Sequence, residues 1–167
     1  LIPCSAEERN LRVDWTRTWP LAVSPGLSSE LSSFLWKMLH NLLPTQARLN
    51  RLGMPGVPSP VCILCDSGDP DELIHAFFLC AHNSFLGDFL ISGLEKLTHS
   101  ISPQDIVVLN LDLEVDVAPA AVFLIATVLS QVWTSRKEKK KCQLYLIRAE
   151  LEARTTLLRY SRMGEIL

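Results

Sequence analysis

The sequence is 167 residues long, enough for one domain with a hydrophobic core or for such a domain with a helical extension. Its formal net charge of −2 at pH 7 argues against a uniformly basic nucleic-acid-binding protein. The five cysteines do not form paired spacings, which argues against a secreted disulfide scaffold and favours an intracellular compartment. The chain starts at Leu1 and not at Met, so we interpret it as a piece of a longer product.

The charges are distributed unevenly along the chain. Residues 1–61 contain six Lys/Arg and four Asp/Glu, residues 62–118 contain one and ten, and residues 136–162 contain nine and three. The net charges of these blocks are therefore +2, −9 and +6. This asymmetry predicts a scaffold with one cationic arm near its C-terminal end.

The first predicted helix follows an N-terminal segment, 1–26, that we interpret as a linker. Apolar residues recur on one helical face over residues 27–42. Ser28 is the candidate N-cap, and Pro44 stands just past the predicted end. The pattern indicates a long amphipathic helix. Together with the elements that follow, it opens a helical zinc-binding domain predicted over residues 27–100.

A shorter helix is predicted next, over residues 45–52. Thr45 is placed to cap its N-terminus, and Gly53 is placed to stop it.

A metal-binding motif follows. Cys62, Cys65, His75 and Cys80 have the spacing C-x2-C-x9-H-x4-C. Three thiolates and one imidazole complete a tetrahedron around Zn²⁺ and leave no open position for a substrate or a water nucleophile. The sequence therefore predicts a structural zinc site that holds the fold together and is not itself catalytic.

The second half of this motif lies in a predicted short helix over residues 71–80. His75 and Cys80 are five residues apart, slightly too far for one face of an α-helix, so we expect the helix to end or unwind near Cys80. His82 closely follows Cys80 and is an alternative fourth ligand in place of His75.

Two segments with different periodicity come after the motif. Residues 85–97 repeat the amphipathic helical pattern. Apolar residues then alternate with polar ones from Leu109 to Val117. We interpret residues 101–117 as an acidic extended linker or a strand, with both alternatives open because a lone strand leaves its backbone unpaired.

The C-terminal part, residues 118–167, is predicted to contain two helices. Residues 118–135 are uncharged and mostly apolar, which favours a buried core helix opened by Pro119 over a membrane span, because polar residues interrupt the run. A basic helix without Gly or Pro is predicted from Arg136 to about Met163. The predicted fold class is mostly α: a small zinc-stapled domain with a long basic C-terminal helix.

The residues around the metal motif also carry a resemblance. Residues 34–45, F-L-W-K-M-L-H-N-L-L-P-T, with Arg48-Leu49 behind them, resemble the lead-in F-x-W-[KR]-x-L-x-N-x-L-P-T-x-x-R-L. This lead-in precedes the zinc-binding (CCHC) domain that follows the reverse transcriptase in non-LTR (LINE-type) retrotransposon polyproteins. The C-x-x-C and E-x-x-H-x-F-x-x-C patterns of the same family match residues 62–65 and 72–80.

The resemblance implies a zinc cofactor and a role as accessory domain. The parent would be an RNA-directed DNA polymerase with an endonuclease, working by target-primed reverse transcription in the nucleus. No catalytic residue is predicted in this chain. The implied partners are RNA and/or DNA and the rest of the reverse transcriptase, with no membrane and no small-molecule substrate.

Nucleic acid is expected to meet the cationic arm and not the metal loop, whose acidic residues repel phosphate. The predicted contacts are nine cations and one tryptophan that stacks on a base: Lys37, Arg48, Arg51, Arg136, Lys137, Lys139, Lys140, Lys141, Arg148 and Trp133. The alternative is a zinc-stabilised protein-interaction module that docks a partner helix on the apolar stripe of residues 144–158.

Overall fold

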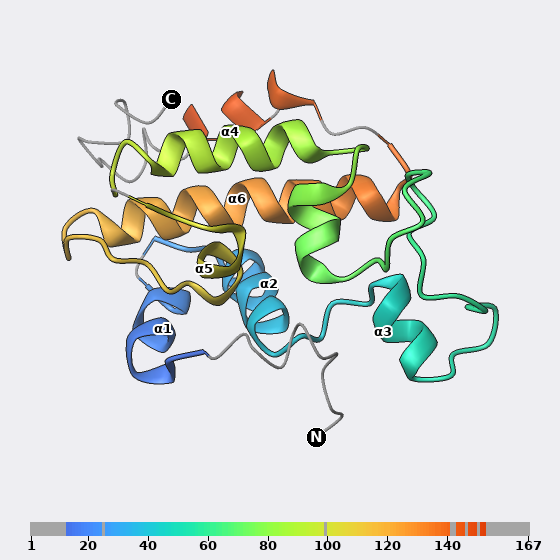
Figure 1. The fold of residues 1–167 in the computed structure, drawn as a ribbon. Helices are drawn as coiled ribbons and strands as arrows, with labels where there is room; N and C mark the ends of the chain where they lie inside the picture. The colour runs from blue at the N-terminus through green and yellow to red at the C-terminus, as the bar shows by residue number, and fades with distance from the viewer. Residues whose placement is uncertain are drawn as a thin grey trace.

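The computed structural model describes residues 13–24, 26–98, 100–140, 143–145, 147–149 and 151–152. Within these residues the fold is mostly helical, as predicted, and contains no strand beyond an isolated bridge between Val61 and Pro70. The helices, drawn in Figure 1, are α1 (Trp15–Ala22), α2 (Ser29–Leu39), α3 (Gln46–Arg51), the π-helix η2 (His75–Leu79), α4 (Ser84–Leu94), α5 (Pro103–Val108) and α6 (Ala118–Lys137).

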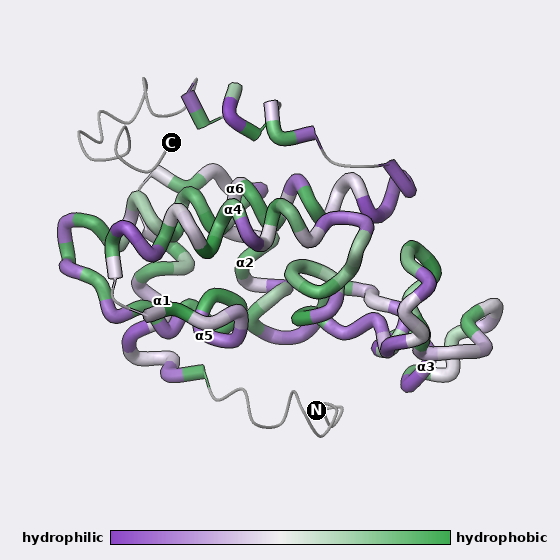
Figure 2. The backbone as a smooth tube through the Cα atoms, turned by 45° about the horizontal axis from the view of Figure 1, so that its top comes forward, coloured by the Kyte–Doolittle hydropathy of each residue, from purple (hydrophilic) through white to green (hydrophobic). Residues whose placement is uncertain are grey.

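Helix α6 forms the centre of the hydrophobic core. It contacts α1, α2, α4 and η2, and every residue from 120 to 129 is buried. In the view of Figure 1, α4 lies above α6, and α1, α2 and α5 lie below it. Figure 2 shows that hydrophobic residues recur along both α4 and α6. The predicted core helix with proline in its first turn is confirmed.

Helix α6 also has the length and apolar composition of a membrane-crossing helix, with a mean hydropathy of 1.4 over its most apolar 18-residue window. However, 72% of that window is buried inside the fold. Packing against four other helices accounts for the apolar character of α6 without a membrane.

The two helices predicted before the metal motif are present with their predicted caps. The Ser28 hydroxyl accepts a hydrogen bond from the Leu31 N–H, and the Thr45 hydroxyl accepts one from the Arg48 N–H. Past the end of α3, Gly53 adopts a φ of +63°, a conformation that favours glycine at the end of a helix.

Helix α1 was not predicted and lies in the segment interpreted as a linker. Its N-cap is Asp14, whose carboxylate accepts a hydrogen bond from the Thr16 N–H. Thr18 and Ala22, one helical turn apart, are the residues that α1 buries.

The prediction of a linker or strand over residues 101–117 is wrong for its first half, where α5 forms. Ser102 and Asp105 make a reciprocal capping box, and Pro103 occupies the first turn of α5. The alternation from Leu109 onward does not describe one sheet face, because Leu109 adopts a φ of +53° and Val115 is 91% exposed.

The predicted continuous helix from Arg136 is also corrected. Helix α6 ends at Lys137. The Lys140 N–H then donates to the Ser135 carbonyl, with Lys139 left-handed at a φ of +55°, which is a Schellman ending. Described residues within 144–152 are again helical, and the predicted helical residues beyond 152 lie outside the described part of the chain.

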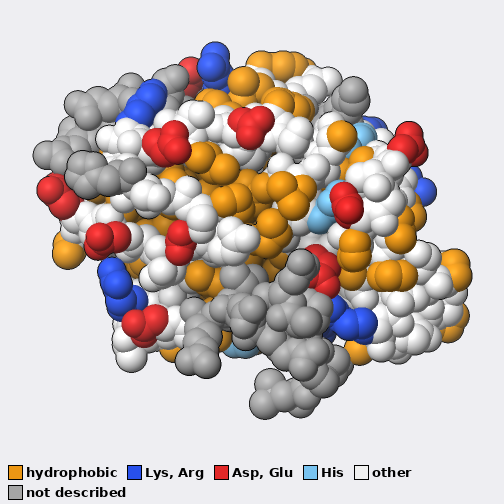
Figure 3. Space-filling view, in the orientation of Figure 1, with side chains coloured by type: hydrophobic (Ala, Val, Ile, Leu, Met, Phe, Trp, Pro, Cys, Tyr) orange, Lys and Arg blue, Asp and Glu red, His pale blue; other side chains and the backbone are white. Residues whose placement is uncertain are grey.

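The described surface does not show a broad basic region on the face drawn in Figure 3. There, Lys and Arg side chains lie singly among Asp and Glu side chains. Any phosphate-binding surface on this face would therefore involve few cations.

Candidate metal centre

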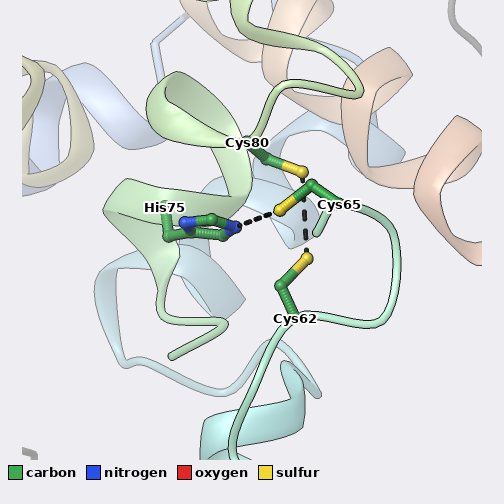
Figure 4. Close-up of side chains that lie close together, drawn as sticks. All are labelled: Cys62, Cys65, His75 and Cys80. Carbon is green, nitrogen blue, oxygen red and sulfur yellow. Dashed lines mark hydrogen bonds between the residues drawn. The ribbon is translucent and has the colours of Figure 1, made fainter. Parts of the chain in front are cut away.

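The four predicted ligands come together at the C-terminal end of α6. Cys62 and Cys65 belong to the loop before η2, His75 begins η2, and Cys80 immediately follows it. Their side chains point toward a common centre in Figure 4, and one ligand atom from each lies within 4.8 Å of all the others.

The loop that carries Cys62 and Cys65 is closed at its base by backbone hydrogen bonds. The Cys62 N–H donates to the Asp69 carbonyl at 3.0 Å, and the Asp71 N–H donates to the Pro60 carbonyl at 2.9 Å. Inside the loop, the Leu64 N–H donates to Cys62 Sγ at 3.4 Å. The backbone thus holds both sulfurs on one side of a short turn.

The π-helix explains the five-residue spacing between the other two ligands. The Cys80 N–H donates to the His75 carbonyl at 2.8 Å, the i to i+5 bond of a π-turn. This wider turn brings residues five apart onto the same side. Cys80 itself is extended, with φ −67° and ψ +116°, so the expected end of the helix at this residue is confirmed.

Two of the distances between ligand atoms match the edges of a zinc tetrahedron. Cys62 Sγ and Cys80 Sγ are 3.8 Å apart, and Cys65 Sγ is 3.4 Å from His75 Nε2. Zinc bonds of about 2.3 Å to sulfur and about 2.0 Å to nitrogen imply tetrahedral edges of about 3.8 Å and about 3.5 Å. The donor set, three sulfurs and one imidazole nitrogen, also fits zinc chemistry.

Burial affects the protonation of two ligands, Cys62 and His75. Cys62, His75 and Cys80 are 4%, 4% and 1% exposed. Burial raises the pKa of Cys62 to about 11, so a metal must displace a proton from this thiol when it binds. Burial also lowers the pKa of His75, which favours the neutral imidazole that ligates metals.

His82, the alternative ligand, is held elsewhere. Its Nε2 donates to the Lys140 carbonyl at 3.0 Å and so joins the loop after Cys80 to the end of α6. The cluster of possible ligands in the described residues contains His75 and not His82.

We expect His75→Ala to weaken metal affinity strongly and His82→Ala to leave it nearly unchanged. Loss of His75 removes a ligand, whereas loss of His82 removes one exposed hydrogen bond, worth about 1 kcal/mol. Competition with a chelator measures both affinities. The reverse order of the two variants would assign the fourth ligand to His82.

An ion pair that was not predicted from the sequence lies beside the sulfurs. Arg136 Nη2 binds Asp71 Oδ1, and their side chains are only 5% and 7% exposed. The same Nη2 is 3.8 Å from Cys62 Sγ. The burial of Arg136 could have been predicted from the sequence, because its position continues the buried face of α6 after Leu129 and Val132.

This pairing corrects one of the predicted nucleic-acid contacts, since the Arg136 guanidinium is almost fully buried and already bound to Asp71. Two further predicted cations are engaged within the chain. Arg48 donates to the Asn41 carbonyl, and Arg51 pairs with Glu72 at 3.2 Å.

The remaining predicted contacts differ in exposure. Lys37, Lys137, Lys139 and Arg148 are exposed, and the exposed Lys140 pairs with Glu138 at 3.1 Å. Trp133 is partly buried, and its ring centroid lies 6.2 Å from that of Phe77. Lys141 lies outside the described residues.

Comparison with known proteins agrees with this site. A family model described as zinc-binding in reverse transcriptase matches residues 5–86, which include all four ligands. This match confirms the predicted resemblance of residues 5–86 to the zinc-binding domain of reverse transcriptases. No curated protein and no solved structure matches the chain. Residues 5–86 thus match an accessory zinc domain that is associated with reverse transcriptases.

Proposed function

We propose that this chain is the nucleic-acid-binding accessory domain of a non-LTR retrotransposon reverse transcriptase and that its metal is zinc in a CCHC site. It grips template RNA or target DNA beside the polymerase during target-primed reverse transcription. The parent protein carries the polymerase and endonuclease activities and works in the nucleus. The family match and the lead-in residues 34–45 support the parent, and the ligand distances support the metal.

One observation carries the nucleic-acid part of this proposal: an open pocket of ≈ 170 Å³ between the metal loop and the end of α6. Trp133, Ile63 and Leu64 give it apolar lining, and Lys137 and Lys139 give it positive charge, while the charges of the neighbouring Arg136–Asp71 pair oppose each other. An unpaired nucleotide needs these two features, an apolar contact for its base and cations for its phosphates.

The size of the pocket limits what it holds. It is smaller than the roughly 300 to 1,000 Å³ of sites that enclose a whole small molecule. It suits a single ring that belongs to a longer, mostly exposed ligand. A single-stranded nucleic acid satisfies this condition, because one base can leave the stack while its neighbours remain outside.

The alternative function, docking of a partner helix, is not supported by the described residues. Ile147 and Leu151 are both 0% exposed, and Leu144 packs against the same core. The described part of the apolar stripe is therefore already covered by the chain itself.

We expect the double replacement Lys137→Ala and Lys139→Ala to weaken binding to single-stranded RNA or DNA. The logarithm of the binding constant falls linearly with the logarithm of the salt concentration, and each phosphate contact adds about 0.7 to the steepness of that slope. Loss of two contacts should therefore make the slope shallower by about 1.4. Fluorescence anisotropy over a series of salt concentrations measures affinity and slope together.

Two controls accompany this experiment. Lys96→Ala changes the charge of a surface segment away from the pocket and should leave the slope unchanged. Asp69→Asn should leave binding equal or slightly tighter, since it removes negative charge near the metal loop. Unchanged affinity and slope in a folded, metal-loaded double variant would contradict the proposed site.

A further inference from the structure

The ion pair of Arg136 and Asp71 lies in a buried environment that is unfavourable for charged groups. It is buried beside the sulfurs of the metal centre, where each charge loses most of its hydration. Asp71 is held from two sides, because its Oδ2 accepts a hydrogen bond from the Gln46 N–H at 3.0 Å while Oδ1 binds Arg136. The carboxylate is therefore fixed at the start of α3, and it fixes the guanidinium in turn.

Asp71 does not satisfy the guanidinium completely. Arg136 Nη1 is buried and has no hydrogen-bond partner among the described residues. The guanidinium thus has further donors next to sulfur atoms that become anionic when they bind a metal.

The charges around the metal centre also indicate a role for Arg136. Zinc with three thiolates and a neutral imidazole carries about −1, and Asp71 adds another negative charge close to it. Arg136 supplies the positive charge between the two. Without it, two negative centres would face each other in a buried environment, where their repulsion is weakly screened.

We propose that Arg136 is a positioning residue of the metal centre, whose guanidinium donates to the thiolate of Cys62 and stabilises the metal-bound state. Asp71 orients this guanidinium. The inference rests on the metal binding proposed above but is independent of nucleic-acid binding.

A purely mechanical role for the pair makes a different prediction. If the ion pair only ties α6 to the metal loop, loss of either partner breaks the tie and weakens metal binding to a similar extent. If Arg136 acts through its charge, loss of Arg136 weakens zinc binding, whereas loss of the Asp71 charge leaves zinc binding equal or tighter. Arg136→Met leaves Asp71 unpaired beside an anionic centre, whereas Asp71→Asn leaves a cation there.

The test compares zinc affinities, measured by chelator competition at one pH, of full-length Arg136→Met, Arg136→Lys, Asp71→Asn and Lys137→Met. The last is the matched control, because it removes the same charge from the adjacent, exposed position. We expect Arg136→Met to bind zinc about 10- to 100-fold more weakly, the range typical for loss of a residue that supports metal ligands. Arg136→Lys should recover part of that loss, Lys137→Met should bind nearly as the natural chain does, and Asp71→Asn should bind equally or more tightly.

Substitution of Co²⁺ for zinc gives a second readout. A hydrogen bond to a thiolate lowers the energy of the sulfur lone pairs and so raises the energy of the sulfur-to-cobalt charge-transfer band. This band should therefore move to lower energy in Arg136→Met and stay in place in Lys137→Met.

Three results would overturn the inference: equal weakening by Arg136→Met and Asp71→Asn, equal weakening by Lys137→Met, or an unchanged affinity of folded Arg136→Met. If Arg136→Met does not fold, Asp71→Asn decides, since weaker zinc binding by that variant contradicts the charge role. Absence of zinc from the natural chain would instead contradict the proposed function.

Discussion

Replacing Cys62 or Cys80 with Ser is expected to abolish stable metal binding and to unfold the region from about residue 55 to 85. Between α3 and α4 the only regular element is η2 with the short helical turn that leads into it, so turns and the metal ligands organise this region. Binding of a structural zinc supplies about 10 to 16 kcal/mol in small zinc peptides near neutral pH, and this free energy becomes folding free energy. Elemental analysis, thermal melts with and without chelator, and hydrogen exchange across residues 55–85 measure the effect.

A matched control exists for this substitution. Cys142 is not among the four predicted ligands, so Cys142→Ser should leave the metal content at one ion per chain. A natural chain without metal, or a melt that strong chelators do not change, would show that the cluster is not a structural metal site.

The second large effect is expected from Phe77→Ala. Phe77 lies in η2 between two metal ligands, is 0% exposed, and contacts Phe34 edge-on with ring centroids 6.3 Å apart. Removing such a buried ring typically costs about 3 to 5 kcal/mol, because it leaves a cavity that the surrounding core fills only partly. Denaturant unfolding of the metal-loaded protein gives the change in free energy.

Phe85→Ala is the matched control for this loss. Phe85 lies on α4, the neighbour of η2, but is 43% exposed. Its replacement should cost well below half as much, since less apolar area is removed from the interior. Similar losses for the two variants would mean that η2 is not anchored through Phe77.

The sequence allowed the ligands and the helices before them to be predicted because their signals are local. The ligands of a zinc site are chemically restricted residue types at short spacings. Likewise, Ser28 and Thr45 cap helices through bonds to residues three positions ahead. Helix α5, which was not predicted, also has a local signal, the capping box of Ser102 and Asp105. The alternating pattern that follows it favoured an extended segment instead.

Other features depended on contacts that are distant in sequence. Whether Arg136 meets phosphate or Asp71 depends on where the end of α6 lies, 65 residues after Asp71. The end of α6 itself carries a lysine in a left-handed conformation, where glycine is the usual signal. The spacing of the motif favours His75 over His82 as the fourth ligand. The structure gives the physical reason, a π-turn at His75–Leu79, which could not be predicted from the residue types in this segment.

The position of α6 determines where this chain can be cut into fragments. The family match ends at residue 86, yet the apolar faces of α2 and η2 are covered by α6, which begins at Ala118. The carboxylate of Asp71 also has its partner on α6. A polypeptide cut at the boundary of the match would retain every metal ligand while its hydrophobic residues faced water. Such a fragment is prone to aggregation, and the smallest autonomous version of this domain must extend through the end of α6.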